Sequence, residues 1–304
     1  MKNKIVLITG GTGSFGNAMI KRLLKLGVKE IRSFSRNEKL QVETKMNASD
    51  KRVNFIVGDI RDYKSLLEAI KGVDYVLNAA AMKHIDKCEK FPLEAKKTNI
   101  DGSVNVINAC IENKVKKLIL LSTDKSANAT TIYGITKMFM EIYGKCVDNK
   151  KTQIISTRYG NVIGSNGSVI EIWKKLAKEG KPLKITDPNI TRFFMTLDEA
   201  LDLVLYALKN GKNGDLFVYN NKACNLKELA DCISDNQEIM GLRCVEKLDE
   251  ALLTTNELNH SELKGNYFKI NEKIQSSIKY DKPLTSDNAE RFTKKELKEM
   301  LKKC

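Results

Sequence analysis

The sequence predicts a doubly wound parallel α/β sheet followed by a smaller C-terminal lobe. Short apolar runs typical of buried strands alternate with segments of helical periodicity through residues 1–159. The first run, 5–8, leads into a glycine-rich turn at 9–16, after which apolar residues recur at helical spacing. Beyond residue 160 this alternation weakens, which indicates a second substructure.

Each further element follows from the same patterns. In the first part we expect strands at 30–35, 53–57, 73–77, 117–121 and 152–159, with helices over 93–109 and 133–147. In the second part we expect helices over 169–178, 197–208 and 294–303, a strand over 215–219, and a polar Gly/Ser loop over 161–168. Strand, helix and strand in alternation favour a parallel sheet whose chemistry lies at the carboxyl ends of the strands.

The glycine-rich turn has the order that dinucleotide binding requires, namely strand, turn and helix. Gly10 permits a tight turn, Gly13 lets the backbone approach a pyrophosphate, and Gly16 lets the helix pack on the strand. The spacing is G-x-x-G-x-x-G, and the helix that follows directs its positive end at the phosphates. The candidate cofactor residues of this turn are Gly10, Thr12, Gly13, Ser14, Phe15 and Gly16.

The second strand ends in Ser35 and Arg36, without the acidic residue that would hold a ribose 2′-hydroxyl. Arg36, with Lys39 nearby, suits a 2′-phosphate, so we expect NADP as the cofactor in preference to NAD. Asp59 follows the third strand, where it could meet the adenine amino group. The other candidate cofactor residues are Ile60, Ala79, Ala80, Ala81, Asn99, Tyr133 and Lys137.

Residues 122–137 combine several groups that can move protons. Thr123, Asp124 and Lys125 follow a buried strand directly, and Tyr133 and Lys137 lie four residues apart on one face of the next helix. A phenol beside an ammonium ion is a candidate general base, because the positive charge stabilises the phenolate. This stretch is the predicted catalytic centre.

Together these patterns predict a dinucleotide-binding Rossmann domain over 1–160, to which 187–213 returns, and a substrate-binding lobe made of 161–186 and 214–304. The chain of 304 residues is long enough for both.

The composition excludes several classes of function. The net charge of +14 comes mostly from Lys spread along the chain, which indicates a solvated surface that attracts an anionic ligand and argues against nucleic acid. The seven Cys are scattered without Cys-x-x-Cys spacing, so we expect neither a metal nor disulfides. No run approaches the roughly 20 apolar residues of a membrane span, so we expect a soluble, cytoplasmic protein.

Several motifs together resemble one family. The turn at 9–16 with Tyr133-x-x-x-Lys137 is similar to the extended short-chain dehydrogenase/reductases. More narrowly, the chain over about residues 4–220 resembles the soluble inverting UDP-N-acetylglucosamine 4,6-dehydratases. The segments that carry this resemblance are 35–36, 58–62, 79–84, 98–100, 122–125, 158–165 and 191–193. Thr123-Asp124-Lys125 is the most specific, because glucose-type 4,6-dehydratases carry Thr-Asp-Glu and epimerases have no acid/base pair there.

The chain departs from the family pattern at two places. Ala129 stands where the family has Pro, and residues 243–247 read Arg-Cys-Val-Glu-Lys in place of Arg-Pro-Gly-Glu-Lys. The second change keeps the charges but loses a Pro-Gly turn. In the family this turn lies near the nucleotide pocket, so its loss would affect the affinity for the UDP group.

The resemblance implies a mechanism. NADP takes hydride from C4 of the sugar while Tyr133 takes the O4 proton and Thr123 orients that oxygen. Lys125, in its neutral form, removes the C5 proton, and Asp124, in its protonated form, assists departure of the C6 hydroxyl. Burial favours both of these uncharged forms. Hydride return to C6 and reprotonation of C5 from the opposite face would give UDP-2-acetamido-2,6-dideoxy-β-L-arabino-hexos-4-ulose.

The resemblance also implies partners. The expected substrate-side residues are Lys83, Asn161, Ser165, Arg192, Arg243 and Glu246. Family members commonly form dimers or hexamers, and the reaction opens deoxy-amino-sugar pathways for glycans, including pseudaminic acid. Two alternatives stay open. A nucleotide-sugar 4-epimerase or 4-ketoreductase would need only Thr123, Tyr133 and Lys137, and a non-catalytic NADP-binding protein would turn over no sugar.

Overall fold

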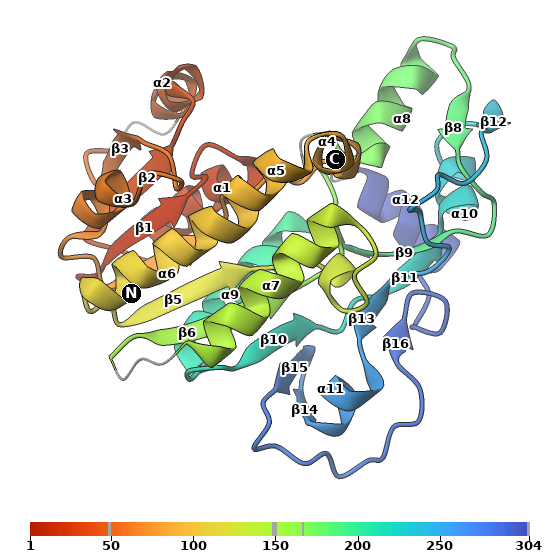
Figure 1. Cartoon of the computed structure of the whole chain (residues 1–304). Helices are drawn as coiled ribbons and strands as arrows, with labels where there is room; N and C mark the ends of the chain where they lie inside the picture. Colours follow the sequence, from red (N-terminus) through yellow and green to blue (C-terminus); the bar gives the residue numbers. More distant parts are fainter. Residues whose placement is uncertain (48–49, 148–150, 166, 303–304) are drawn as a thin grey trace. The chain divides into compact units, whose positions relative to one another are not determined.

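The computed structural model describes residues 1–47, 50–147, 151–165 and 167–302, and the chain forms two compact units (Figure 1). Unit 1 contains Met1–Thr157 and Leu201–Phe217, and unit 2 contains Arg158–Ala200 and Val218–Cys304. The sequence-based division placed the returning segment at 187–213, whereas the segment found in unit 1 is 201–217.

Unit 1 is built on a large sheet with the strand order β10-β6-β5-β4-β1-β2-β3. The strands are β1 (Ile5–Thr9), β2 (Glu30–Ser35), β3 (Val53–Val57), β4 (Tyr75–Asn78), β5 (Lys117–Leu121), β6 (Gln153–Arg158) and β10 (Leu216–Tyr219), the last two of which run into unit 2. From β3 to β6 all neighbouring pairs are parallel. The predicted doubly wound α/β fold is therefore confirmed, and the order reverses between β1 and β4, where such folds bind ligands.

The helices of unit 1 connect these strands. They are α1 (Ser14–Lys25), α2 (Glu38–Asn47), α3 (Tyr63–Ile70), α4 (Ile85–Lys90), α5 (Pro92–Ala95), η1 (Lys96–Asp101), α6 (Gly102–Glu112), η2 (Asp124–Ser126) and α7 (Ile132–Cys146), with most of α9 (Leu197–Asn210). The prediction of one regular helix over 93–109 is wrong in detail, because η1 is π-helical. The wider turn brings Thr98 and Asn99 into the interior, where both are almost fully buried.

The core of unit 1 explains why the strands are apolar runs. Leu7, Val76, Leu118 and Leu120 are fully buried from solvent, and helices α3 and α6 pack their apolar residues into the same cluster. Strands covered on both faces bury nearly every side chain, so alternation disappears. Each such Leu or Val contributes roughly 1.5–3 kcal/mol through burial.

Unit 2 consists of short elements. They are β7 (Asn161–Val162), α8 (Val169–Lys178), β8 (Leu183–Ile185), β9 (Thr191–Met195), β11 (Ala223–Asn225), α10 (Leu226–Asp231), β12 (Gln237–Ile239), β13 (Ala251–Leu253), α11 (Thr255–Asn259), β14 (Ser261–Lys264), β15 (Tyr267–Ile270), β16 (Leu284–Thr285) and α12 (Lys294–Lys302). Strands β11, β9 and β7 form one small sheet, and a core cluster contains Trp173, Phe194 and Leu297.

The sequence predicted α8, α9, β10 and α12, and these are confirmed, although Lys303 and Asn166 of the predicted elements lie outside the described residues. The short strands of unit 2 were not predicted. In the part of the chain that the structure describes, no helix is long and apolar enough to cross a membrane.

The packing of unit 1 can be tested at one strand position. Leu120→Ala removes a fully buried side chain of β5, so we expect the free energy of unfolding to fall by about 2–5 kcal/mol. Leu40→Ala, at a position of α2 that is 40% exposed, is the matched control and should change stability by under about 1 kcal/mol. Urea unfolding followed by circular dichroism measures both. Equal losses in the two variants would contradict the assigned core.

Candidate active site

The turn after β1 is tied to the segment that follows β4. Thr9 donates its hydroxyl to the Asn78 side-chain oxygen at 2.7 Å, and the backbone N–H of Ala80 donates to the Thr9 hydroxyl oxygen at 3.1 Å. Gly10 has a φ of +67°, and a Cβ built there would lie 3.0 Å from the Ala80 backbone. The turn residues and Ala79, Ala80 and Ala81 therefore meet at the point where the sheet order reverses.

The N-terminus of α1 fits a dinucleotide phosphate. The N-cap residue is Gly13, which has no side chain to accept hydrogen bonds from the first backbone N–H groups. No acidic residue stands in the first turn. A Cβ at Gly16 would collide with the carbonyl of Gly11, so glycine is required for the helix to lie against the turn. Thr12, Ser14 and Phe15 complete the turn. Backbone N–H groups and the helix dipole here favour an anion.

The end of β2 places a cation beside Asp59. Arg36 Nη1 lies 3.7 Å from Asp59 Oδ2, while Arg61 holds the same carboxylate through its side chain at 2.7 Å and its backbone N–H at 2.9 Å. Burial alone would raise the pKa of Asp59, but hydrogen bonds from Arg61 and the charges of Arg61 and Arg36 lower it below its ordinary value. Arg36 and Lys39 are exposed, and Ser35 is buried.

Two predicted cofactor residues point into the protein. Asn99 accepts a hydrogen bond from the backbone of Met82 at 2.8 Å and donates to the Met82 carbonyl and to Thr136 Oγ1, each at 3.0 Å. Ile60 is 4% exposed and belongs to the core of unit 1. These contacts are typical of residues that hold the surrounding backbone in place and do not touch a cofactor directly.

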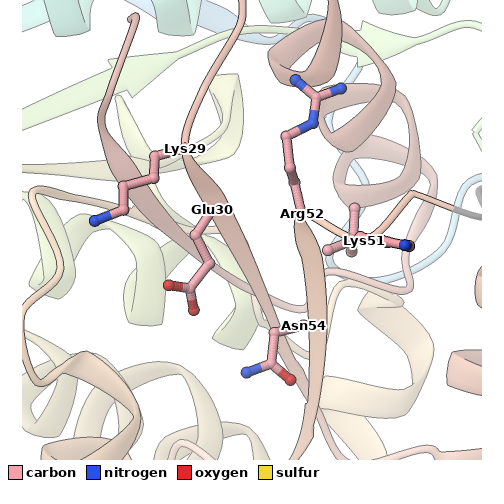
Figure 2. Close-up of a pocket in the computed structure, with 6 residues that line it drawn as sticks. Lys29, Glu30, Lys51, Arg52 and Asn54 are labelled. Atoms are coloured by element: carbon pink, nitrogen blue, oxygen red, sulfur yellow. The ribbon is translucent and has the colours of Figure 1, made fainter.

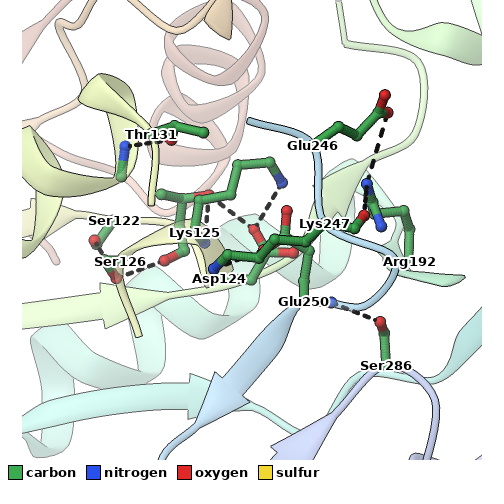
Figure 3. Close-up of polar contacts among 12 residues, drawn as sticks. Ser122, Asp124, Lys125, Ser126, Thr131, Arg192, Glu246, Lys247, Glu250 and Ser286 are labelled. Carbon is green, nitrogen blue, oxygen red and sulfur yellow. Dashed lines mark hydrogen bonds and ion pairs between the residues drawn. The ribbon is translucent and has the colours of Figure 1, made fainter. Parts of the chain in front are cut away.

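Thr123, Asp124 and Lys125 form a connected group at the carboxyl end of β5 (Figure 3). Asp124 Oδ1 accepts hydrogen bonds from the Thr123 hydroxyl and from Lys125 Nζ, each at 3.0 Å. Asp124 is fully buried, and its Oδ2 has no hydrogen-bond partner among the described residues. A buried carboxylate oxygen without a partner is costly unless a ligand occupies it.

Helix α7 carries the other two predicted catalytic residues. Thr131 caps the helix by accepting from the backbone N–H of Gly134, so the first turn that holds Tyr133 is well fixed. Lys137 follows one turn later and is 3% exposed. Burial lowers the pKa of Lys137 to about 8, although the Glu141 carboxylate acts in the opposite direction.

In unit 2 the predicted substrate residues fall in two places. Asn161 is in β7 and Ser165 in the loop that follows. Arg192, on β9, donates to the carbonyls of Thr191, Leu248 and Lys247 at 2.7 to 2.9 Å and lies 3.8 Å from Glu246 (Figure 3). It therefore holds the segment that contains residues 243–247.

Within that segment, the Glu246 backbone N–H donates to the Arg243 carbonyl at 3.0 Å. The turn therefore forms although the sequence lacks Pro-Gly. Arg243 is exposed. In unit 1, Lys83 is exposed in the loop between β4 and α4.

A hollow at the amino end of β2 and β3 is a separate feature. It is lined by Lys29, Glu30, Lys51, Arg52, Val53 and Asn54 (Figure 2). Arg52 is already paired with Asp50, and the hollow lies at the opposite end of the strands from the glycine turn. It shares no residue with the predicted site.

Sequence reasoning missed Ser126 and Glu141, which hydrogen-bond at 2.7 Å. Glu141 lies four residues after Lys137, so helical spacing could have indicated it. The Thr9–Asn78 pair was also missed, because nothing local joins two residues on separate strands.

Comparisons with known proteins identify the family. Residues 6–272 match the polysaccharide biosynthesis protein family. A curated protein of Rickettsia rickettsii (strain Sheila Smith), named UDP-glucose 4-epimerase, is 40% identical, with 98% of this chain and 95% of that protein covered.

Two solved structures are similar. Pen from Bacillus thuringiensis is 33% identical with a TM-score of 0.94, covering 99% of this chain and 98% of that one. DesIV, a dTDP-glucose 4,6-dehydratase from Streptomyces venezuelae solved with NAD and TYD bound, has 19% identity and a TM-score of 0.71 over 80% of this chain and 86% of that one. The second similarity supports the fold alone.

The chain therefore belongs to the polysaccharide biosynthesis protein family and is an enzyme with the extended short-chain dehydrogenase/reductase fold of nucleotide-sugar epimerases and dehydratases.

Proposed function

We propose that the protein is a UDP-N-acetylglucosamine 4,6-dehydratase that inverts C5. The observation that carries the proposal is the buried Asp124–Lys125 pair, with one carboxylate oxygen of Asp124 unoccupied within the described protein. Elimination of water across C5 and C6 needs one acid and one base beside each other. Epimerisation at C4 needs neither, so a buried pair would have no purpose there.

The residues divide the reaction between them. NADP, when bound, supplies the oxidant for C4 and returns the same hydrogen to C6. Tyr133 takes the O4 proton as a phenolate, which the Lys137 ammonium stabilises before the transfer. Thr123 orients O4. The 4-ketone then makes the C5 hydrogen acidic enough for an amine base.

The Asp124–Lys125 pair holds the proton that elimination uses. Lys125 Nζ lies 3.0 Å from Asp124 Oδ1, so the proposed base and the proposed acid are held beside each other. Lys125 then takes the C5 proton, Asp124 gives its proton to the leaving C6 hydroxyl, and one water is released.

The rest of the site supports an NADP cofactor and a UDP-sugar. The N-terminus of α1, which Gly13 leaves without a side-chain hydrogen bond, suits the pyrophosphate, and Arg36 suits the 2′-phosphate. Lys83, Asn161, Ser165, Arg192, Arg243 and Glu246 are proposed as substrate residues, with Lys83 near the sugar and Arg192 near the nucleotide. The proposed setting is cytoplasmic, at the start of a deoxy-amino-sugar pathway.

A second candidate is 4-epimerisation of a UDP-sugar. The name of the Rickettsia rickettsii relative favours it, at 40% identity. Proton NMR of the purified protein with UDP-N-acetylglucosamine in D₂O, without added cofactor, separates the two. A new methyl signal with deuterium at C5 and L-arabino couplings supports the proposal. A C4 epimer without a methyl signal, from this sugar or from UDP-glucose, would establish the epimerase instead.

Substitutions can distinguish the role of the proposed acid, Asp124, from that of the proposed base, Lys125. Asp124→Asn should lower methyl formation by at least about 100-fold but keep deuterium exchange at C5, because only the acid is lost. Lys125→Met should abolish both methyl formation and exchange. Asp281→Asn and Lys282→Met, at an adjacent Asp-Lys pair that is exposed, are matched controls and should retain activity. Full turnover by Asp124→Asn would rule out the elimination assignment.

Arg36 should select the cofactor. Arg36→Ala removes the guanidinium proposed for the 2′-phosphate, so the Kd for NADP should rise about 10- to 100-fold while the Kd for NAD stays within about twofold. Isothermal titration after removal of bound nucleotide measures both. Lys45→Ala, which removes an exposed cation of α2, is the control. Equal losses for NAD and NADP would refute the 2′-phosphate role.

We also propose that the protein is a homo-oligomer, a dimer or a hexamer. Helix α7 exposes Ile135, Phe139 and Ile142 on one face, with 42%, 41% and 53% of each residue accessible. Leu93, on the neighbouring helix α5, is 71% exposed. A row of exposed apolar side chains on packed helices is typical of an association surface.

Phe139→Glu tests this surface. A charge in the middle of a self-complementary apolar face should convert the oligomer to a monomer, as measured by light scattering after size exclusion. Met46→Glu, at a 77% exposed position of α2, should leave the oligomer intact. An unchanged mass for Phe139→Glu would show that α7 is not the interface.

A further inference from the structure

Glu141 makes a contact that its position on a helix surface does not require. It lies on α7 one turn after Lys137, and its Oε1 accepts a hydrogen bond from Ser126 Oγ at 2.7 Å. Ser126 is 1% exposed. A buried hydroxyl that donates to a carboxylate makes a charge-assisted bond, which is stronger than a bond between neutral groups. The contact therefore joins α7 firmly to the turn after β5.

Ser126 in turn closes that turn. Its backbone N–H donates to the Thr123 carbonyl at 3.0 Å, and its Oγ lies 2.6 Å from the same oxygen. The Ser126 hydroxyl thus lies between two acceptors, the Thr123 carbonyl and the Glu141 carboxylate, and shares its one proton between them. Movement of Ser126 would therefore move the Thr123 backbone.

The chain of contacts continues into the proposed catalytic groups. The Thr123 hydroxyl donates to Asp124 Oδ1, and Lys125 Nζ donates to the same oxygen, each at 3.0 Å. Glu141 thus reaches the acid and the base through Ser126 and Thr123.

Glu141 also acts on Lys137 through its charge. Lys137 is almost fully buried, and burial lowers its pKa to about 8, whereas Glu141 raises it. Without that negative charge, the ammonium form of Lys137 would be lost at a lower pH.

The other titratable groups around α7 are on the elements packed against it, namely η2, η1, α4, α5, α6 and β5. They are Asp124, Lys125, Lys96, Lys97, Asp101, Asp86, Lys87, Cys88, Glu89, Lys90, Glu94, Cys110, Glu112 and Lys117. Several are held elsewhere: Lys96 pairs with Asp101, Lys97 with Glu94, and Lys117 donates to the carbonyl of Leu208. Glu89 accepts from the backbone N–H of Ile132 at the start of the helix.

We propose that Glu141 is a positioning residue that couples the two halves of the proposed site. It fixes the turn that bears Thr123, Asp124 and Lys125, and its carboxylate stands one helical turn from Lys137. The catalytic part of this inference rests on the proposed function, whereas the charge on Lys137 does not.

Three substitutions separate the hydrogen bond from the charge. Glu141→Gln keeps an oxygen that can accept from Ser126 but removes the charge. Glu141→Asp keeps the charge but shortens the reach to Ser126, and Ser126→Ala removes the hydroxyl alone. Glu112→Gln, at an exposed position of α6, is the control for loss of a carboxylate, and thermal unfolding checks that each variant folds.

The main readout is the protonation of Lys137, followed by NMR of lysine labelled with ¹³C at Cε. Its signal should titrate near pH 8, apart from exposed lysines at about 10.4, and should be missing in Lys137→Met. In Glu141→Gln the midpoint should fall below the wild-type value, and the basic limb of the kcat profile should fall with it. In Glu141→Asp and Ser126→Ala the midpoint should stay within about half a unit while kcat drops about tenfold.

A wild-type midpoint in Glu141→Gln, or an unchanged kcat in Ser126→Ala, would overturn the proposal. Failure of the proposed function looks different. If the wild-type protein dehydrates no nucleotide sugar, the elimination assignment is lost, but the midpoint of Lys137 in Glu141→Gln still decides whether Glu141 sets its charge.

Discussion

The site depends on keeping a carboxylate and an ammonium group side by side with little water around them. Asp124 is fully buried and Lys125 nearly so, with a single oxygen of Asp124 serving both Thr123 and Lys125. Burying an ion pair is costly unless its geometry is good and its remaining groups are satisfied. Here one oxygen is left without a partner in the described protein, which is a stability cost.

Parallel strands make this arrangement possible. Their carboxyl ends lie at one edge of the sheet, so the loops after β1, β2, β3, β4 and β5 collect the glycine turn, Arg36, Asp59, the alanine segment and the Thr123 turn. The buried Thr9–Asn78 contact holds two of these loops together. An apolar sheet interior thus positions polar groups that share no sequence neighbourhood.

Helix α7 serves several requirements at once. It presents Tyr133 and Lys137 on one side, is linked through Glu141 to the turn after β5, and exposes Phe139 and its neighbours on another side. Association through α7, if it occurs as proposed, would stabilise the same helix that carries the proposed general base.

The parallel α/β fold and the glycine turn at the end of β1 could be predicted from the sequence, because they depend on local periodicity and on strand ends. Residues 123–125 could be grouped with 133 and 137 as a candidate site for the same reason. The sequence did not reveal the π-helical turn at 96–101, which turns Asn99 toward Met82 and Thr136. Nor did it show that Arg192 is occupied by three carbonyls or that Glu141 reaches Ser126. Those outcomes arise from contacts between residues distant along the chain, and only the tertiary structure decides which hydrogen-bond donor meets which acceptor.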